Sequence, residues 1–189
     1  FLLGEGIVTD PREILAITCT PGTPDEARVT LAKAPAGLAK ARLARTHEIR
    51  SSCGVCGTAD AQTILDDTPA LLPGIPALDP ARIPTLLSAL AERQELFALT
   101  GGCHGALVAA ADGTVLGSAE DVGRHNALDK AVGAAASCGA DLTRAVAVLS
   151  GRAGFDLVVK CLRVRIPIVI SVSAPSSLAF DLCRAAGAT

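Results

Sequence analysis

The sequence predicts an α/β fold, in which a mixed sheet carries helices on both faces and a small β-rich lobe precedes it. Three observations predict it. Apolar runs alternate with helical patterns in the second half of the chain, which is typical of βαβ units. Two short strand-like segments near the start flank a Pro-Gly turn. Several prolines between residues 69 and 84 separate the two parts of the chain.

The composition excludes several classes of protein. The chain has 189 residues, half of them hydrophobic, which suits one domain or two small lobes around a shared core. No apolar run approaches the roughly 20 residues of a membrane span. Aromatic residues are 2% of the chain and the net charge is −2, so we expect no nucleic-acid partner. We interpret the local basic cluster of Lys160, Arg163 and Arg165 as a solvated face.

We divide the chain into a β-rich lobe over residues 1–50, a cysteine loop with a proline-rich connector over 51–80, and an α/β core over 81–189. The lobe has predicted strands at 14–18 and 27–31, and the connector begins with a short helix at 61–66. The chain starts with Phe1 rather than Met and stops just after a helix-ending glycine, so we expect a longer natural protein.

The core elements follow in order. A stripe of leucines predicts a helix over 84–99, and an Asp-Gly turn predicts a hairpin of strands at 104–111 and 114–118. A helix over 121–136 presents small side chains, which allows it to pack closely on a sheet. The alternation then predicts, in order, a strand at 145–149, a helix at 154–162, a strand at 166–172 and a helix at 176–186.

Polar, small-residue loops follow the last two predicted strands. Ligands collect at the carboxyl ends of strands in open α/β sheets, so both loops are candidates for one pocket. The first loop, Ser150-Gly151-Arg152, supplies a hydroxyl, an open backbone and a guanidinium, which suits a phosphate. The second, residues 171–177, contains Ser173, Ser176 and Ser177 and precedes a helix start. Helix capping explains one of its serines as well as phosphate binding does, and both interpretations stay open.

The segment from Glu120 to Lys130 carries seven functional side chains in eleven residues. On a helix, His125 lies four residues from both Asp121 and Asp129, so one face could hold a carboxylate–imidazole–carboxylate row. A charged helix face is often only solvated surface, but this density beside a glycine favours a functional interpretation. Arg124 and His125 are therefore candidate binding residues.

Two of the seven cysteines, Cys53 and Cys56, lie in a glycine-containing loop, where they could pass on sulfur or an electron pair, or hold a metal. An odd cysteine count without a secretory signal predicts a reducing compartment, the cytoplasm. We expect four other cysteines to be small buried hydrophobes, namely Cys19, Cys138, Cys161 and Cys183.

A zinc-binding or thiol-redox module is the alternative interpretation of the cysteine pair. Cys53 and Cys56 could form a four-ligand zinc site with Cys103 and His104, although no second cysteine pair has zinc-ribbon spacing. The zinc deaminase signature is missing, because Ser52 rather than proline precedes Cys53. A thioredoxin-like site is less favoured, because the cysteines do not open a helix after the first strand.

Five motifs occur together and in order: Ser-Ser-Cys-Gly-Val-Cys-Gly at 51–57, Thr-Gly-Gly-Cys-His-Gly-Ala at 100–106, Glu-Asp-Val-Gly-Arg-His-Asn-Ala-Leu-Asp-Lys at 120–130, Ser-Gly-Arg at 150–152 and Ser-Val-Ser-Ala-Pro-Ser-Ser-Leu-Ala at 171–179. With them, nearly the whole chain resembles the formate dehydrogenase accessory sulfurtransferases, the FdhD family. The resemblance implies a cytidine-deaminase-like α/β fold without the deaminase zinc site, no permanent metal, and a homodimer.

The resemblance also implies a function. A cysteine desulfurase would supply sulfur, which Cys53 would carry as a persulfide with Cys56 as its companion. The sulfur would pass to the molybdenum cofactor, in its bis-guanine-dinucleotide form, before insertion into formate dehydrogenase. The strand-end loops and the 120–130 segment then offer a cradle for the phosphates of that cofactor. Its candidate residues are Arg124, His125, Ser150, Gly151, Arg152, Ser173, Ser176 and Ser177.

Overall fold

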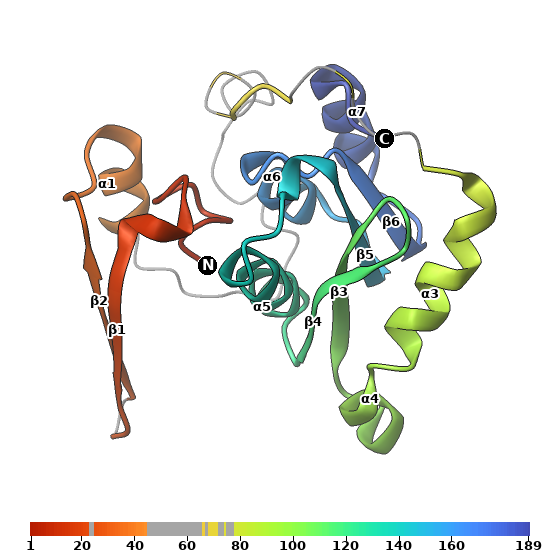
Figure 1. Ribbon diagram of the computed structural model, residues 1–189, viewed down its shortest axis with the longest axis horizontal. Coiled ribbons are helices and arrows are strands. Elements are labelled where there is room, and N and C mark those ends of the chain that lie inside the picture. The colour runs from red at the N-terminus through yellow and green to blue at the C-terminus, as the bar shows by residue number, and fades with distance from the viewer. Residues whose placement is uncertain (23–24, 45–65, 67, 72–73, 75–77) are drawn as a thin grey trace.

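The computed structural model describes residues 1–189 except 23–24, 45–65, 67, 72–73 and 75–77, and it contains two separate sheets. An antiparallel ribbon pairs β1 (Ile14–Thr20) with β2 (Glu26–Leu31). The larger sheet has the strand order β4-β3-β5-β6 (Figure 1). Its strands are β3 (His104–Ala110), β4 (Val115–Asp121), β5 (Ala145–Arg152) and β6 (Ile168–Ser173).

The larger sheet is mixed. β3 runs antiparallel to both β4 and β5, while β5 and β6 run parallel. Parallel neighbours need a crossover, and here α6 (Phe155–Arg163) supplies it. The predicted hairpin at the Asp112-Gly113 turn and the predicted βαβ unit are therefore both confirmed.

Helices cover both faces of this sheet, because successive residues of each strand point to opposite sides. Ala106 and Val108 pack on the face covered by α5 (Arg124–Ser137) and α6. Leu107 lies on the other face, which α3 (Ile83–Ala91) covers with Leu86 and Leu90. A third apolar cluster packs α7 (Ser177–Ala186) against α6.

Helix α5 lies unusually close to the sheet at Gly117 of β4. A Cβ atom at Gly117 would lie 2.5 Å from the carbonyl oxygen of Ala131 and 2.8 Å from the amide nitrogen of Ala135. Only glycine leaves room for the helix backbone at this distance. The buried face of α5 is largely alanine, as the sequence predicts, so the close approach is allowed from both sides.

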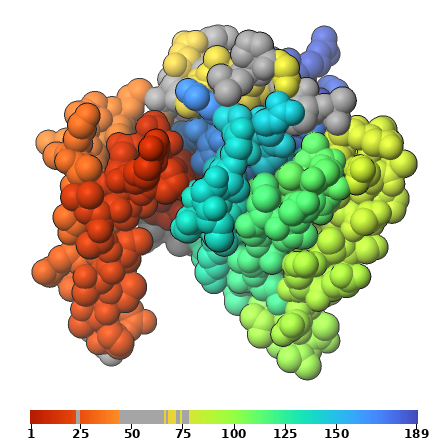
Figure 2. All heavy atoms as spheres, viewed as in Figure 1, coloured from red at the N-terminus to blue at the C-terminus, as the bar shows by residue number. Residues whose placement is uncertain are grey.

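The N-terminal part forms a lobe beside this core. It contains β1, β2 and α1 (Gly37–Ala44), and the β1–β2 ribbon stands apart from the core at the left of Figures 1 and 2. Leu15 and Ile17 of β1 are exposed, and a groove of about 910 Å³ lies between the ribbon and the end of α5. Leu3, Ile7 and Val8 do pack on the core or are buried. The proposed boundaries at residues 50 and 80 stay a prediction.

Three short 3-10 turns each begin after an aspartate whose carboxylate accepts a hydrogen bond from a backbone amide two residues on. They are Pro11–Glu13, Pro80–Arg82 and Leu142–Arg144. Over the described stretches of the chain, no helix combines the length and the apolar character needed to cross a bilayer.

The predicted helix over 84–99 is wrong in one respect, because it is two helices, α3 and α4 (Glu95–Thr100). The cause is Glu120 of β4. Its carboxylate accepts hydrogen bonds from the amides of Leu96 and Phe97, each over 2.8 Å. A carboxylate at two otherwise unsatisfied amides starts a new helix there.

The helix predicted over 121–136 begins three residues later, at Arg124. Asp121 is the last residue of β4, where it pairs with His104 of β3. The sheet ladder therefore holds this part of the segment in an extended conformation. Most of the short helix predicted at 61–66 lies outside the described residues.

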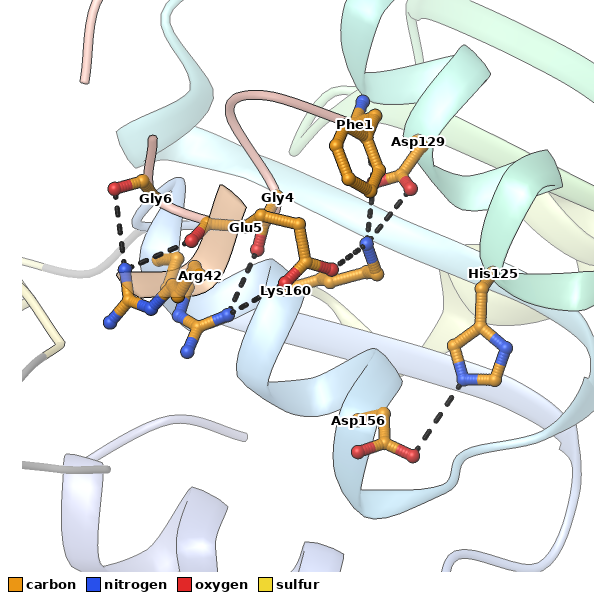
Figure 3. A network of polar contacts seen from close by, with 10 residues as sticks. Phe1, Gly4, Glu5, Gly6, Arg42, His125, Asp129, Asp156 and Lys160 are labelled. Atoms are coloured by element: carbon orange, nitrogen blue, oxygen red, sulfur yellow. Dashed lines mark hydrogen bonds and ion pairs between the residues drawn. The ribbon is translucent and has the colours of Figure 1, made fainter. Parts of the chain in front are cut away.

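The basic cluster at the end of α6 is a solvated face only at Arg165, whereas the sequence suggests one at all three residues. Lys160 is 7% exposed, and its ammonium lies 2.7 Å from Glu5 and 2.8 Å from Asp129. Arg163 is also largely buried, with a guanidinium nitrogen 3.5 Å from Glu5. Arg165, in contrast, is exposed. Figure 3 shows this network between the N-terminal segment and helices α5 and α6.

Candidate functional site

The two candidate loops lie side by side at the carboxyl ends of β5 and β6. The parallel register pairs Leu149 with Ser171 and Arg152 with Ser173. The Ser171 hydroxyl lies within hydrogen-bond distance of the carbonyls of Gly151 and Ser173 and can donate to one at a time. The structure thus brings Ser150-Gly151-Arg152 next to the 171–177 loop, as the strand order requires.

The serines of the second loop have different roles. Ser176 is the N-cap of α7, and its hydroxyl oxygen accepts from the amide of Ala179 at 3.2 Å. Its own amide donates to the carbonyl of Ala153 over 3.1 Å, which ties α7 to the end of the first loop. Ser173 and Ser177 are exposed. Capping therefore explains Ser176, and Ser173 and Ser177 present their hydroxyls to solvent.

The start of β3 lies at the same edge of the sheet as the carboxyl ends of β5 and β6, and we call this the strand-end edge. The amide of Gly105 donates to the Ser150 hydroxyl over 2.8 Å. A Cβ atom at Gly151 would lie 3.3 Å from His104 Nδ1, so the imidazole of His104 packs against the first loop. The sequence suggests no role for His104 beyond that of a possible zinc ligand and a place in the 100–106 motif. The position of His104 beside this loop follows from the antiparallel pairing of β3 with β5, and no local sequence pattern reveals that pairing.

Helix α5 begins beside this edge, because β4 ends there opposite His104. Arg124 and His125 are the first residues of α5 and both are half-buried. The Nε atom of Arg124 is buried and has no hydrogen-bond partner among the described residues. His125 Nε2 lies 3.8 Å from Asp156 Oδ2 on α6, which is an ion-pair distance but too long for a hydrogen bond.

Most of the 120–130 segment is structural, so the predicted carboxylate–imidazole–carboxylate row is wrong. Asp121, at the end of β4, accepts from the Gly123 amide and from the side chains of Asn126 and Lys130. These contacts, above all the Lys130 ammonium, lower the pKa of the Asp121 carboxyl. The carboxylate of Asp129 lies at Lys160. Arg124 and His125, the first residues of α5, stay candidate binding residues.

A sequence profile of the FdhD/NarQ family matches residues 1–189, which is the whole chain. The chain belongs to the FdhD/NarQ family. The resemblance inferred from the five motifs is thereby confirmed.

Relatives within the FdhD/NarQ family align with the chain from end to end. The sulfur carrier protein FdhD of Anaeromyxobacter sp. (strain K) is 39% identical over 203 residues, covering 100% of this chain and 70% of the relative. The sulfur carrier protein FdhD of Thermoplasma volcanium is 38% identical over 191 residues, covering 100% of this chain and 68% of the relative.

The fold has a solved counterpart in a protein assigned as a formate dehydrogenase accessory protein from Desulfotalea psychrophila. The two structures superpose with a TM-score of 0.73 at 28% identity, covering 100% of this chain and 68% of that chain. A mixed four-stranded sheet with a separate two-stranded sheet is therefore the fold of this FdhD/NarQ chain. The finer prediction of a cytidine-deaminase-like fold stays a prediction.

The cysteine pair of this FdhD/NarQ chain, Cys53 and Cys56, lies outside the described residues. The zinc set that includes Cys103 and His104 is therefore untested. Where the chain is described, no three His, Cys, Asp or Glu side chains are grouped so that they could hold a metal ion.

The other cysteines differ from each other in burial. Cys161 is buried as predicted, and burial raises the pKa of its thiol to about 12. Cys183 is half-buried, and burial also raises its pKa. The prediction is wrong for Cys19 and Cys138, which are both exposed. Cys19 lies on the solvent-exposed ribbon and Cys138 caps the end of α5, so neither sits under another layer.

The strand-end edge has the chemistry of an anion site. Arg152 and Arg124 supply guanidinium groups, and His104 and His125 supply imidazoles. The helices α5, α6 and α7 all begin here, after Gly123, Gly154 and Ser176. Amides at helix starts and guanidinium groups both bind phosphate oxygens. A cavity of about 430 Å³ opens beside the second loop, lined in part by Ser171, Ser173 and Phe180.

Proposed function

We propose that this chain carries sulfur as a persulfide on Cys53 and delivers it to the molybdenum cofactor in its bis-guanine-dinucleotide form. A cysteine desulfurase is the proposed donor, formate dehydrogenase the proposed recipient of the cofactor, and the cytoplasm the proposed compartment. The observation that carries this proposal is the alignment of the whole chain with sulfur carrier proteins named FdhD at 39% identity. The accessory-protein assignment of the structural counterpart supports the link to formate dehydrogenase.

The proposed sulfur chemistry needs two exchange steps and no external oxidant. The Cys53 thiolate attacks the outer sulfur of a persulfide on the donor enzyme. The bond between the two donor sulfurs breaks, and the donor cysteine leaves as a thiolate. In one route of release, the Cys56 thiolate attacks the inner sulfur of the Cys53 persulfide. A Cys53–Cys56 disulfide forms and the outer sulfur leaves as hydrosulfide, while direct relay of the outer sulfur to Cys56 is the other route.

The strand-end edge is the proposed cradle for the cofactor, which is written here as substrate. Its diphosphates suit the guanidinium groups of Arg124 and Arg152 and the helix starts beside them. Ser173 and Ser177 have exposed hydroxyls that can donate to phosphate oxygens. The hydroxyl oxygens of Ser150 and Ser176 accept from the amides of Gly105 and Ala179, and each hydroxyl keeps its own hydrogen to donate to a phosphate oxygen. Gly151 leaves room for His104.

Mass spectrometry of the sulfur-loaded protein tests the carrier role. Incubation with a cysteine desulfurase and cysteine should add about 32 Da per sulfur to the Cys53 peptide. Cys53→Ala should abolish this gain and the activation of formate dehydrogenase, while Cys56→Ala should impair delivery more than loading. Cys138→Ala, at an exposed cysteine outside this pair, is the matched control and should change neither.

Three outcomes would contradict the proposal. Full activation of formate dehydrogenase by Cys53→Ala would exclude the carrier role, and sulfur only on Cys103 would move the chemistry there. One tightly bound zinc per chain, lost with Cys53→Ala, would support the zinc-binding alternative.

Binding of guanosine diphosphate tests the cradle separately. Arg152→Ala should weaken binding by about tenfold, as expected for a lost charge-assisted hydrogen bond. Arg144→Ala is the matched control, because Arg144 is exposed and lies before the opposite end of the same strand. If the two variants bind guanosine diphosphate with equal affinity, Arg152 is not part of the proposed cradle. The predicted homodimer is tested by the molar mass of the protein in solution.

A further inference from the structure

A buried group of charges joins the N-terminal segment to the core, and we call it the Glu5 joint. It consists of Glu5, Arg42, Asp129 and Lys160, which Figure 3 labels, and of Arg163. The Lys160 ammonium donates to Glu5 Oε1 over 2.7 Å and to Asp129 Oδ2 over 2.8 Å. Arg163 on the same helix lies 3.5 Å from the other carboxylate oxygen of Glu5. Three elements far apart in the sequence thus meet at one ammonium group.

The joint is largely shielded from water. The side chains of Lys160 and Asp129 are 8% and 9% exposed. Buried ion pairs gain little net stability over apolar packing, because each charge loses its hydration. They do fix the relative position of their partners, since an uncompensated buried charge is strongly unfavourable. A geometric role therefore explains this arrangement better than a purely stabilising one.

The backbone around Glu5 fits closely into the joint. A Cβ atom at Gly4 would lie 2.5 Å from Asp129 Oδ1 and 3.3 Å from Lys160 Cγ. Gly6 has a φ of +64°, and a Cβ there would lie 2.7 Å from Arg42 Nη1. Gly6 needs glycine because of its positive φ, and Gly4 leaves room for the Asp129 carboxylate, so this segment packs closely against the joint.

Arg42 connects the joint to α1. Its guanidinium donates to the carbonyl of Glu5 over 2.9 Å and to that of Gly6 over 3.3 Å. Helix α1 ends at Ala44, and Cys53 follows nine residues later (53 − 44 = 9). The β1–β2 ribbon is separated from α5 by the wide groove. The joint therefore holds in place the helix from which the chain leaves toward Cys53.

The joint also lies next to the candidate site. On α6, Lys160 follows Asp156 by one helical turn, and on α5, Asp129 follows His125 by one turn. The pair of His125 and Asp156 belongs to the strand-end edge, and the pair of Asp129 and Lys160 belongs to the joint. Figure 3 shows that both pairs lie between α5 and α6, one helical turn apart.

We propose that the Glu5 joint fixes where the cysteine-bearing segment leaves the lobe relative to the strand-end site. Glu5, Arg42 and Lys160 are then positioning residues for sulfur delivery. The inference rests on the proposed function, because it requires Cys53 to carry the sulfur. It assigns a role to residues that contact neither the sulfur nor the cofactor.

A distance measurement tests the joint independently of sulfur chemistry. Cys19 on β1 and Cys138 after α5 are both exposed and can carry spin labels, once Cys53, Cys56, Cys103 and Cys183 are replaced by serine. The distance distribution between the labels should be narrow in the parent protein. Glu5→Gln and Arg42→Ala should broaden it, while Lys40→Ala, an exposed cation on the same helix, should not. Unchanged distributions in both joint variants would overturn the proposal.

A comparison of loading with delivery tests the positioning role in the protein with all its cysteines. Arg42→Ala and Glu5→Gln should gain sulfur on Cys53 as the parent does, within about twofold, but lower the activation of formate dehydrogenase about tenfold or more. Arg42→Lys should restore part of the delivery, because it keeps a cation at the same place. Lys40→Ala should match the parent in both assays.

The possible outcomes separate the two proposals. Equal losses of loading and delivery in the joint variants would indicate a folding defect and overturn the positioning role. Full delivery with a broadened distance distribution would overturn it too. If Cys53 accepts no sulfur in the parent protein, the proposed function fails, whereas the distance measurement still decides whether the joint holds the lobe.

Discussion

The amide of Gly105 donates a hydrogen bond to the hydroxyl oxygen of Ser150 over 2.8 Å, and this contact ties the start of β3 to the end of β5. Gly105 is buried and Ser150 is half-buried, so water does not readily replace the hydroxyl. Part of the strand-end edge therefore depends on a bond between residues 45 positions apart.

Removing this hydroxyl should destabilise the fold. Ser150→Ala deprives a buried amide of its acceptor, which should lower the free energy of unfolding by about 1–2 kcal/mol. Urea denaturation measures this change. Ser137→Ala, at an exposed serine that ends α5, should stay within about 0.5 kcal/mol of the parent protein. A Ser150→Ala protein as stable as the parent would show that the bond contributes nothing.

Gly117→Ala should also be destabilising, because the new methyl group would collide with the backbone of α5 at Ala131 and Ala135. We expect a loss of about 1–3 kcal/mol, typical of overpacking. Gly133→Ala on α5 is the control, since a Cβ atom there meets nothing within 4 Å. This control should be neutral or stabilising by up to about 1 kcal/mol, because alanine favours helix. Thermal unfolding of both variants checks the pair, and equal losses would contradict the packing argument.

The cysteines should react in an order set by their exposure. At about pH 8, Cys19 and Cys138 should be alkylated by iodoacetamide within minutes, while Cys161 should stay unmodified. Its pKa of about 12 keeps the Cys161 thiol protonated at that pH, and burial blocks the reagent. Peptide mass spectrometry reads the modification site by site. In denaturant all three should react alike, and early modification of Cys161 in the folded protein would contradict its burial.

The Asp121 carboxylate should make stability depend on pH in acid. Its pKa is lowered in the folded protein, chiefly by the Lys130 ammonium and then by the Gly123 amide. Its contribution is therefore fully present above the pKa of the unfolded chain, and it is lost as the pH falls through the lower folded value. Asp121→Asn should cost about 1 kcal/mol at neutral pH.

The difference between the parent and Asp121→Asn should shrink as the pH falls below about 4, where the aspartate of the unfolded chain takes up its proton. Chemical denaturation at a series of pH values measures both proteins. Asp25→Asn serves as the control, at an exposed aspartate of the lobe. A difference that stays constant down to about pH 2 would contradict the linkage.

Local sequence patterns predict most of the elements, because a strand or helix that buries one side shows its period directly. The hairpin at Asp112-Gly113 and the βαβ unit around α6 are examples. The division of the helix over 84–99 was not predictable in this way. It depends on Glu120, a residue of another strand, whose carboxylate starts α4. Lys160 gave no local signal either, since its partners Glu5 and Asp129 are 155 and 31 residues away.

The cysteine pair and the two strand-end loops were visible in the sequence, as was the likeness to the FdhD family, because each depends on short motifs in order. The tertiary structure decided which polar residues make contacts within the protein. It placed Asp121 and Asp129 in structural contacts, brought His104 to the edge, and left Arg124 and His125 there. The physical reason is that a charged side chain forms its ion pair or hydrogen bonds with the partner that the fold places beside it. That partner can come from any part of the chain.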